Sequence, residues 1–350
     1  MTPCTFAIPG DHTRRTGGFI YERRLLEELR ASGRAVRHLR LPDGGASPDD
    51  ATRAVWRAAL ETLEPDAPLI LDGLVFGAMR GEDLARIRPP VVAMLHHPMG
   101  LEHGLPAPLA RALLAQESAN LRHAAHVVVT SAHTAQSYVA MGADPRRITV
   151  ALPGFEAARG GTRRDAGPRI LSVGLLAQRK GHDVLIEALR RIADLDWSAQ
   201  IVGKTHDPAI AEALDAQIAR SGLGTRVTLS GDLDDAALAE AFGTARVFAL
   251  ATRYEGYGMA LAEALCHGLP IVSCAAGAVP DTVGAAALLA PPDDPEAFAR
   301  HLRNVLSDAA LRGALEAASR ARGAALPRWR DTAAVMSGVL DRLSALRDPS

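Results

Sequence analysis

The sequence has little of what several large protein classes require. Aromatic residues make up only 4% of the 350 residues, and the net charge is -1. No arginine run is interleaved with aromatics, which argues against a nucleic-acid partner.

No apolar run approaches the roughly 18–20 residues that span a bilayer. The three cysteines (Cys4, Cys266 and Cys274) lack metal-ligand spacing and fit a reducing compartment. Since the first residues also lack a signal-peptide pattern, we expect a cytoplasmic protein.

Lysine is also scarce. Only Lys180 and Lys204 occur among the 39 basic residues, a bias typical of a GC-rich genome. A lysine that persists can mark a position that needs a compact ammonium group rather than a planar guanidinium. Chance survival explains Lys204 equally well, whereas Lys180 lies in a motif described below.

Short apolar runs that alternate with amphipathic segments dominate the chain. Continuous apolar strands separated by helices are typical of a parallel sheet covered on both faces. The alternation breaks at 155–168, a glycine-rich and charged stretch, and then restarts. The predicted strands are 5–8, 35–39, 69–71, 91–95, 126–130 and 148–151, then 169–173, 198–202, 226–230, 247–251, 270–273 and 286–289. The predicted helices are 18–32, 108–123, 183–192, 208–221, 235–243, 257–267, 295–307 and 331–347.

This pattern predicts an α/β protein with two Rossmann-like, doubly wound domains. We assign residues 1–158 to an N-terminal domain, 159–328 to a C-terminal domain and 329–350 to a terminal helix. Ligands of open α/β sheets lie outside the carboxyl ends of the strands, so two facing domains would place a site in a central cleft. The strand-to-helix junctions are therefore the segments to examine for chemistry.

The most informative junction follows the predicted strand 247–251. It contains Glu255, a Gly-Tyr-Gly turn and Glu263, about two helical turns further on. Glycines allow close backbone approach, and the free N–H groups of a helix start can hold an anion. A carboxylate can accept two sugar hydroxyls but is repelled by a diphosphate. The pair therefore suits a sugar at one end of a diphosphate and a ribose at the other. The alternative is that neither residue binds a ligand: Glu255 is then a helix-start residue favoured by the helix dipole, and Glu263 is a solvated helix residue.

Two other loops carry features that suit anions. Arg179 and Lys180, followed by Gly181, come after the strand 169–173 and could neutralise a leaving diphosphate. Gly17 and Gly18 come after the first strand and can offer N–H donors, although a glycine pair is equally a simple turn. Neither loop matches the dinucleotide fingerprint, which disfavours a dehydrogenase.

His96 and His97 end the strand 91–95, and Glu102 follows. A histidine there can donate to a sugar hydroxyl or act near the reaction centre. Adjacent strand residues point in opposite directions, so one histidine is expected to face the site, with a preference for His97. A zinc pair lacks further spaced ligands. The Asp232-Leu233-Asp234 stretch resembles a metal-binding D-x-D pattern, but its place before a helix favours capping.

With these motifs the sequence resembles the GT-B glycosyltransferases of family 4. The resemblance rests on the Glu-x7-Glu motif from Glu255 to Glu263, on Arg179-Lys180-Gly181, on Gly17-Gly18 and on the histidines at 96 and 97. It implies a retaining enzyme without a metal or cofactor, an acceptor bound by the first domain and a nucleotide sugar bound by the second. It also implies that the terminal helix crosses back to the first domain.

The resemblance implies a role for each motif. Glu255 would contact the transferred sugar, Glu263 the ribose and Lys180 the diphosphate. Catalytic candidates are His97, Lys180 and Glu255, and acceptor candidates are His96 and Glu102. The donor-binding candidates are Gly17, Gly18, Arg179, Lys180, Lys204, Glu255, Gly256, Tyr257, Gly258, Met259, Ala260, Leu261 and Glu263.

One departure affects the diphosphate. Many members of the family have arginine where this chain has Leu175, so either Arg179 or Lys204 would compensate. We expect a UDP-linked sugar, the commonest donor in the family, and an unidentified soluble acceptor, because charges of both signs alternate on the helix 18–32. Alternatives are an epimerase or phosphorylase on the same scaffold and a non-catalytic nucleotide-sugar-binding protein. Membrane association is not favoured, and the oligomeric state stays open.

Overall fold

The computed structural model describes residues 1–156, 167–205 and 207–345. The chain forms two compact units. Unit 1 combines Met1–Gly154 with Pro327–Ser350, and unit 2 is Phe155–Leu326. The boundary predicted at 158/159 lies outside the described residues. Within those residues, no helix is both long enough and apolar enough to cross a membrane.

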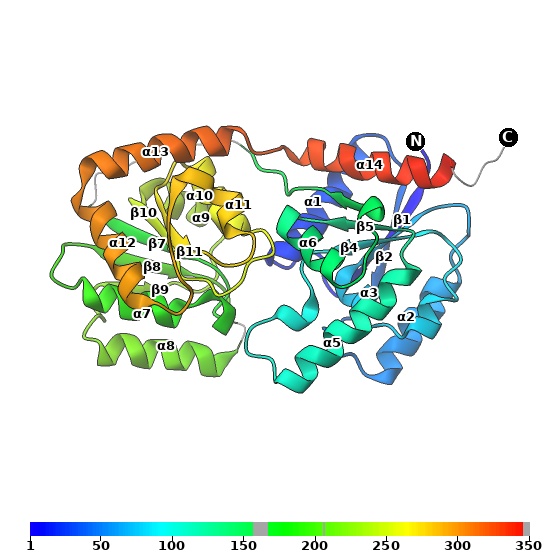
Figure 1. The fold of residues 1–350 in the computed structure, drawn as a ribbon, viewed down its shortest axis with the longest axis horizontal. Helices are drawn as coiled ribbons and strands as arrows, with labels where there is room; N and C mark the ends of the chain where they lie inside the picture. Colours follow the sequence, from blue (N-terminus) through cyan, green and yellow to red (C-terminus); the bar gives the residue numbers. More distant parts are fainter. Residues whose placement is uncertain (157–166, 206, 346–350) are drawn as a thin grey trace. The chain divides into compact units, whose positions relative to one another are not determined.

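Unit 1 contains a six-stranded parallel sheet with the order β2-β1-β3-β4-β5-β6 (Figure 1). Strands β1, β3 and β4 are buried along their whole length, as expected for apolar runs that have helices on both faces. The order reverses between β1 and β3, which makes this pair the topological switch point of the sheet. The strands are β1 (Cys4–Pro9), β2 (Val36–Leu41), β3 (Leu69–Asp72), β4 (Val91–Leu95), β5 (His126–Val129) and β6 (Ile148–Val150).

The helices of unit 1 begin where polar side chains can cap them. Asp49, Asp72 and Ser131 accept hydrogen bonds from the first-turn N–H groups of α2, α3 and α6. The helices are α1 (Gly17–Ala31), α2 (Asp50–Glu61), α3 (Gly73–Ala78), α4 (Gly81–Leu84), α5 (Ala107–Asn120), α6 (Ala132–Ala140) and α14 (Trp329–Ala345). Short 3-10 turns are η1 (Met99–Leu101), η2 (Leu121–His123) and η3 (Pro145–Arg147).

The terminal helix α14 packs beside α1 in unit 1 (Figure 1). The rings of Trp329 and Tyr21 meet edge to face, with centroids 5.6 Å apart. Thr332 Oγ1 donates to the Leu152 carbonyl at 2.7 Å, and buried Arg34 pairs with Asp341 at 2.9 Å. The last helix is therefore part of the core of the unit that the chain begins.

Unit 2 repeats the architecture with the strand order β12-β11-β10-β7-β8-β9. Its switch point lies between β7 and β10, which are hydrogen-bonded neighbours. The strands are β7 (Arg169–Val173), β8 (Ser198–Val202), β9 (Val227–Leu229), β10 (Val247–Leu250), β11 (Ile271–Cys274) and β12 (Ala287–Ala290). The helices are α7 (His182–Arg191), α8 (Pro208–Arg220), α9 (Asp235–Thr244), α10 (Met259–Cys266), α11 (Val279–Val283), α12 (Pro295–Ser307) and α13 (Ala309–Ala324), with 3-10 turns η4 (Gln178–Lys180) and η5 (Gly284–Ala286).

Candidate functional site

The loops after β7 and β10 meet at the switch point of unit 2. Both strands run in the same direction, with Val247 opposite Ile170, so their carboxyl ends lie at the same edge of the sheet. The loop after β7 carries Arg179 and Lys180, and the loop after β10 carries Glu255. This topology brings together residues that are 75 positions apart.

Glycine lets the first loop approach the second strand. Gly181 has a φ of +64°, and a Cβ at this position would collide with the Ala251 carbonyl group. Since only glycine tolerates both conditions, Gly181 fixes the place where the cationic loop turns into α7. The turn η4 ends at Lys180, directly before this glycine.

Lys180 and Glu255 form a nearly buried ion pair. Lys180 Nζ lies 2.6 Å from Glu255 Oε1, and the Thr252 hydroxyl donates to the same oxygen at 3.0 Å. Arg179 lies 3.7 Å from the other carboxylate oxygen, and the Glu255 residue is only 4% exposed. Burial acts to raise the pKa of Glu255, but the charges of Lys180 and Arg179 outweigh it and leave the pKa below its ordinary value. The carboxylate is therefore ionised at neutral pH.

Further bonds tie the two loops to each other. The Arg253 backbone N–H donates to the Arg179 carbonyl at 2.8 Å, and the Thr252 hydroxyl oxygen lies 3.1 Å from the same carbonyl. The Arg253 guanidinium pairs with Asp183 at 2.7 Å and with Asp293 at 2.7 Å. Arg253 thus connects the start of α7 to the loop after β12 and fixes the positions of these segments beside the ion pair.

The N-terminus of helix α10 has no side-chain cap. Gly258 is its N-cap residue, with a φ of +92°, and no side chain caps the helix. The first-turn N–H groups are therefore available to an anion. The Tyr257 side chain is buried and stacks on Phe155 at 6.0 Å, so Tyr257 can contribute to a donor site only through its backbone. The Leu261 side chain is fully buried, so Leu261 too can contribute to a donor site only through its backbone.

Glu263 lies further along α10 and is partly buried. Burial, with a smaller contribution from the charge of Asp235, raises the pKa of Glu263 to about 7. The protonation of this carboxyl group therefore changes near neutral pH. Glu255 and Glu263, which the sequence pairs in one motif, occupy electrostatically opposite environments.

Lys204 follows β8, next to the loop that contains Leu175. The Leu176 N–H donates to the Lys204 carbonyl at 3.0 Å, and the Lys204 side chain is exposed. The Leu175 carbonyl instead contacts the buried ring of His182 at 3.2 Å. The backbone of Lys204 is therefore next to the loop after β7, and Lys204 adds positive charge at this edge of the sheet.

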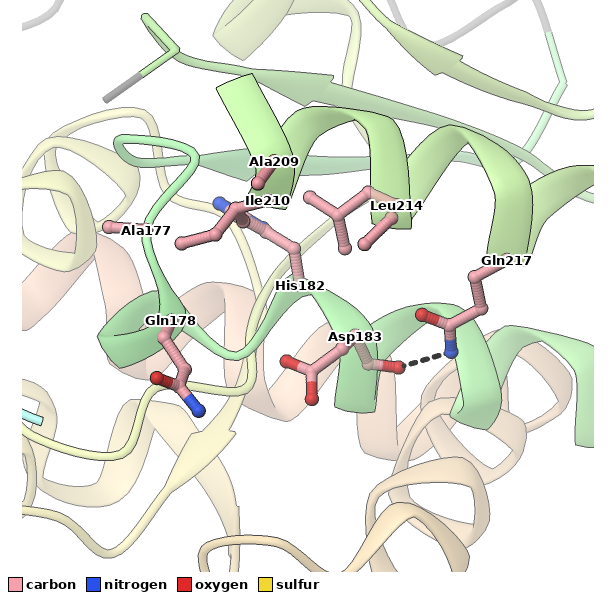
Figure 2. A pocket seen from close by; sticks show the side chains of 9 residues that line it. Ala177, Gln178, His182, Asp183, Ala209, Ile210, Leu214 and Gln217 are labelled. Atoms are coloured by element: carbon pink, nitrogen blue, oxygen red, sulfur yellow. Dashed lines mark hydrogen bonds between the residues drawn. The ribbon is translucent and has the colours of Figure 1, made fainter. Parts of the chain in front are cut away.

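A pocket of about 340 Å³ lies beside the same loop (Figure 2). Ala177, Gln178, His182 and Asp183 line one side, and residues of α8 line the other, where Gln217 donates to the Asp183 carbonyl. Lys180, Glu255 and Glu263 are not among its lining residues. The pocket is thus separate from the ion pair at the switch point.

In unit 1 the two histidines have different surroundings. His97 Nε2 lies 3.3 Å from Glu102, and both side chains are partly exposed. His96 Nε2 lies 3.7 Å from buried Glu22. A Cβ on Gly18 would approach the His96 ring to 3.3 Å, so the glycine pair makes room for this histidine.

The Asp232-Leu233-Asp234 stretch caps a helix, as predicted. Asp234 is the N-cap residue of α9 and accepts a hydrogen bond from the Ala237 N–H at 2.8 Å.

The structure brings Arg179, Lys180 and Glu255 together. It also reveals polar residues that the sequence did not single out: Thr252 and Arg253 in unit 2, and Glu22 and Asp72 in unit 1. Asp72 could have been found, because it is the polar last residue of an otherwise apolar strand, at the edge where ligands bind. Glu22 could have been found as a charge on the apolar face of α1, between Tyr21 and Leu25.

Two Rossmann-like units, each with polar residues at its switch point, match the GT-B fold of glycosyltransferases. The model of the glycosyl transferase 4-like domain matches residues 10–154, and that of glycosyl transferases group 1 matches residues 167–308. The chain therefore belongs to the family 4 glycosyltransferases of GT-B fold.

Named relatives agree with this assignment. The chain is 27% identical over 260 residues to the D-inositol 3-phosphate glycosyltransferase of Jonesia denitrificans, a match that covers 68% of this chain and 61% of that protein. The match thus spans less than two thirds of this relative. Sucrose-phosphate synthase from Thermosynechococcus elongatus superimposes with a TM-score of 0.83 at 22% identity, covering 98% of this chain and all of that one. Anabaena HepE in complex with UDP and glucose gives a TM-score of 0.77 at 16% identity, covering 99% and 100%.

Proposed function

We propose that this protein is a retaining glycosyltransferase that moves a hexosyl or N-acetylhexosaminyl group from a UDP-linked sugar to a soluble acceptor. The observation that carries the proposal is the buried Lys180–Glu255 pair beside the free start of α10. It offers a cation, a carboxylate and unpaired N–H groups within one small region. A nucleoside diphosphate sugar has a complementary set of groups.

In this proposal the cations act on the diphosphate. As the bond between sugar and phosphate breaks, negative charge develops on the leaving phosphate, and Lys180 and the α10 N–H groups stabilise it. Lys204, with Arg179, supplies the charge that Leu175 cannot. Since side chains provide this positive charge, the donor site requires no metal.

The carboxylates act on hydroxyl groups. Glu255, ionised at neutral pH, accepts hydrogen bonds from the transferred sugar, and Glu263 accepts them from the ribose. The leaving diphosphate takes the proton of the acceptor on the face where the sugar bond breaks, so the anomeric configuration is retained. His96, His97 and Glu102 of unit 1 are the candidates for binding the acceptor.

A thermal-shift screen of nucleoside diphosphates and nucleotide sugars tests the donor. A ligand that binds only the native state raises the melting temperature according to its affinity. We expect UDP and one UDP-sugar to give the largest shifts, and a larger response to another nucleotide would contradict the choice of base.

An acceptor screen with the selected donor then tests transfer. Release of UDP only when an acceptor is present supports a transferase, whereas donor conversion without an acceptor would indicate an epimerase. Binding without turnover across the screen would indicate a non-catalytic protein. The anomeric configuration of the product, read from its NMR coupling constants, tests retention.

A further inference from the structure

Three buried or partly buried side chains converge at the switch point of unit 1. Glu22 comes from α1, Asp72 from the end of β3 and His96 from the residue after β4. One ligand atom of each lies within 4.8 Å of the other two. The β1/β3 switch point is the place where a sheet of this order binds its ligand, so these groups stand at the expected site of the unit.

Glu22 lacks the hydrogen-bond donors that a buried acid normally has, whereas Asp72 accepts from two backbone N–H groups. Glu22 is 1% exposed and Asp72 is 4% exposed. Neither oxygen of Glu22 receives a hydrogen bond from a donor among the described residues, and His96 Nε2 is likewise buried without a hydrogen-bond partner there. Ionised carboxylates are acceptors only, so Glu22 and Asp72 can bond to each other only through a shared proton. Buried charges without a cation are costly.

The pKa shifts of the two carboxyl groups follow from their geometry, because two buried acids face each other. Burial raises the pKa of Glu22 to about 7, and burial together with the charge of Glu22 raises the pKa of Asp72. Burial lowers the pKa of His96, so its ring is neutral and can offer a lone pair. A single divalent ion would satisfy all three groups.

We propose that Glu22, Asp72 and His96 hold a divalent first-row transition ion such as Zn²⁺ or Mn²⁺. Ligand atoms bonded at about 2.0–2.2 Å to such an ion lie about 3–3.6 Å apart, and His96 Nε2 is already 3.7 Å from Glu22 Oε1. The ligand set of one imidazole and two carboxylates suits these ions, whereas Mg²⁺ retains several waters and disfavours a dry, nitrogen-containing site.

The surrounding residues hold the ligands in place. Asp72 Oδ1 accepts from the Leu74 and Val75 N–H groups at 2.8 and 3.2 Å, which fixes this carboxylate at the start of α3. The Tyr21 ring meets the His96 ring edge to face at 5.3 Å, and Gly18 leaves space for it. All three ligands belong to unit 1, and the inference does not depend on the proposed sugar transfer.

The test uses the full-length protein, stripped with a chelator and then titrated with Zn²⁺ or Mn²⁺ against a chromophoric chelator. Bound metal is counted by mass spectrometry after gel filtration. The variants are Glu22→Gln and His96→Gln, which keep side-chain size but remove a ligand. The matched control is Glu102→Gln, which removes the carboxylate beside His97.

We expect the unmodified protein and Glu102→Gln to retain one equivalent of metal and to melt at a higher temperature with it. Glu22→Gln and His96→Gln should lose at least about tenfold in affinity, since even outer-shell partners of a metal contribute this much. Circular dichroism of the metal-free variants checks that they are folded, and Asp72→Asn provides a third ligand deletion.

Three results would overturn the inference: no stoichiometric metal in the unmodified protein, equal affinity in Glu22→Gln, or equal loss of metal in Glu102→Gln. The first would leave Glu22 and Asp72 as a proton-sharing pair. The last would identify the exposed His97–Glu102 pair as the metal-binding group.

Discussion

Lys180 Nζ lies 2.6 Å from Glu255 Oε1, so the cation and the carboxylate proposed to meet opposite ends of a glycosyl phosphate are bonded to each other. The pair is nearly dry, with side-chain exposures of 13% and 6%. Lys180 helps to keep Glu255 ionised in a place where an isolated charge would be costly. A donor sugar and its phosphate would enter a region whose charges are already in position.

Replacement of Lys180 by alanine should reduce kcat about 10²–10³-fold, the usual loss when a group that stabilises developing charge is removed. The matched control is Arg190→Ala, which removes an exposed cation from the adjacent helix α7. Steady-state kinetics with saturating donor measures both. An unchanged kcat in Lys180→Ala would refute the role of Lys180 at the diphosphate.

Replacement of Glu263 by glutamine should raise the KM for the donor more than it lowers kcat, because Glu263 is proposed to bind the unreactive ribose. The pKa of Glu263 is raised to about 7. The ionised form, which accepts the hydroxyls, is therefore lost as pH falls through 7, and the donor KM should rise. The variant should lack this rise. Parallel pH profiles in the two proteins would show that another group causes it.

Gly181→Ala should destabilise unit 2 more than Gly222→Ala does. The two glycines have similar φ values of +64° and +69°, but a Cβ at Gly222 meets open space, whereas one at Gly181 strikes the Ala251 carbonyl group. The loss in the free energy of unfolding of Gly222→Ala then reports the strain of the left-handed backbone alone, about 1–2 kcal/mol. The extra loss in Gly181→Ala, measured by denaturant unfolding, reports the collision. Equal losses would mean that the loop moves freely away from β10.

Glu22→Gln should make the protein more stable at pH 8 when a chelator is present. The pKa of Glu22 is about 7 in the folded state, against an ordinary value of 4.5. The folded state therefore holds the proton more tightly, so this group favours folding below pH 4.5, and that contribution is lost as pH rises to 7. Asp72 shifts in the same direction.

Glutamine keeps the size of Glu22 without its charge, so the variant should gain about 1–3 kcal/mol at pH 8. Urea unfolding at pH 5 and pH 8 measures the difference. A variant that is less stable than the unmodified protein at both values would show that the Glu22 carboxylate has a favourable partner.

The sequence predicted the strands well, because their apolar runs are continuous and end at charged or glycine residues. Strands β4, β7 and β8 have the predicted bounds. The predicted ranges do not include helices α2, α3, α4, α6, α11 and α13. In α13 alanines, glycines and arginines leave only Leu315 and Ser319 buried, so its apolar stripe is weak. Packing against α10 rather than a strong pattern holds it in place.

Sequence reasoning also identified the charged loops of unit 2 but not their partners. Lys180 and Glu255 were found because each lies after a strand, and the parallel pairing of β7 with β10 then joins them. Arg253 bonds Asp183 from 70 positions away, and Glu22 meets residues 50 and 74 positions later. No local spacing encodes such contacts, because only the sheet order brings these segments together.

The placement of α14 has a consequence for the order in which the chain can fold. Unit 2 is one continuous segment, whereas unit 1 requires the buried side chains of Trp329, Met336 and Leu340 near the end of the chain. Domains generally fold as they leave the ribosome, from the N-terminus onward. Here the segment synthesised first needs a segment synthesised after unit 2, so unit 2 is expected to complete its core before unit 1 does.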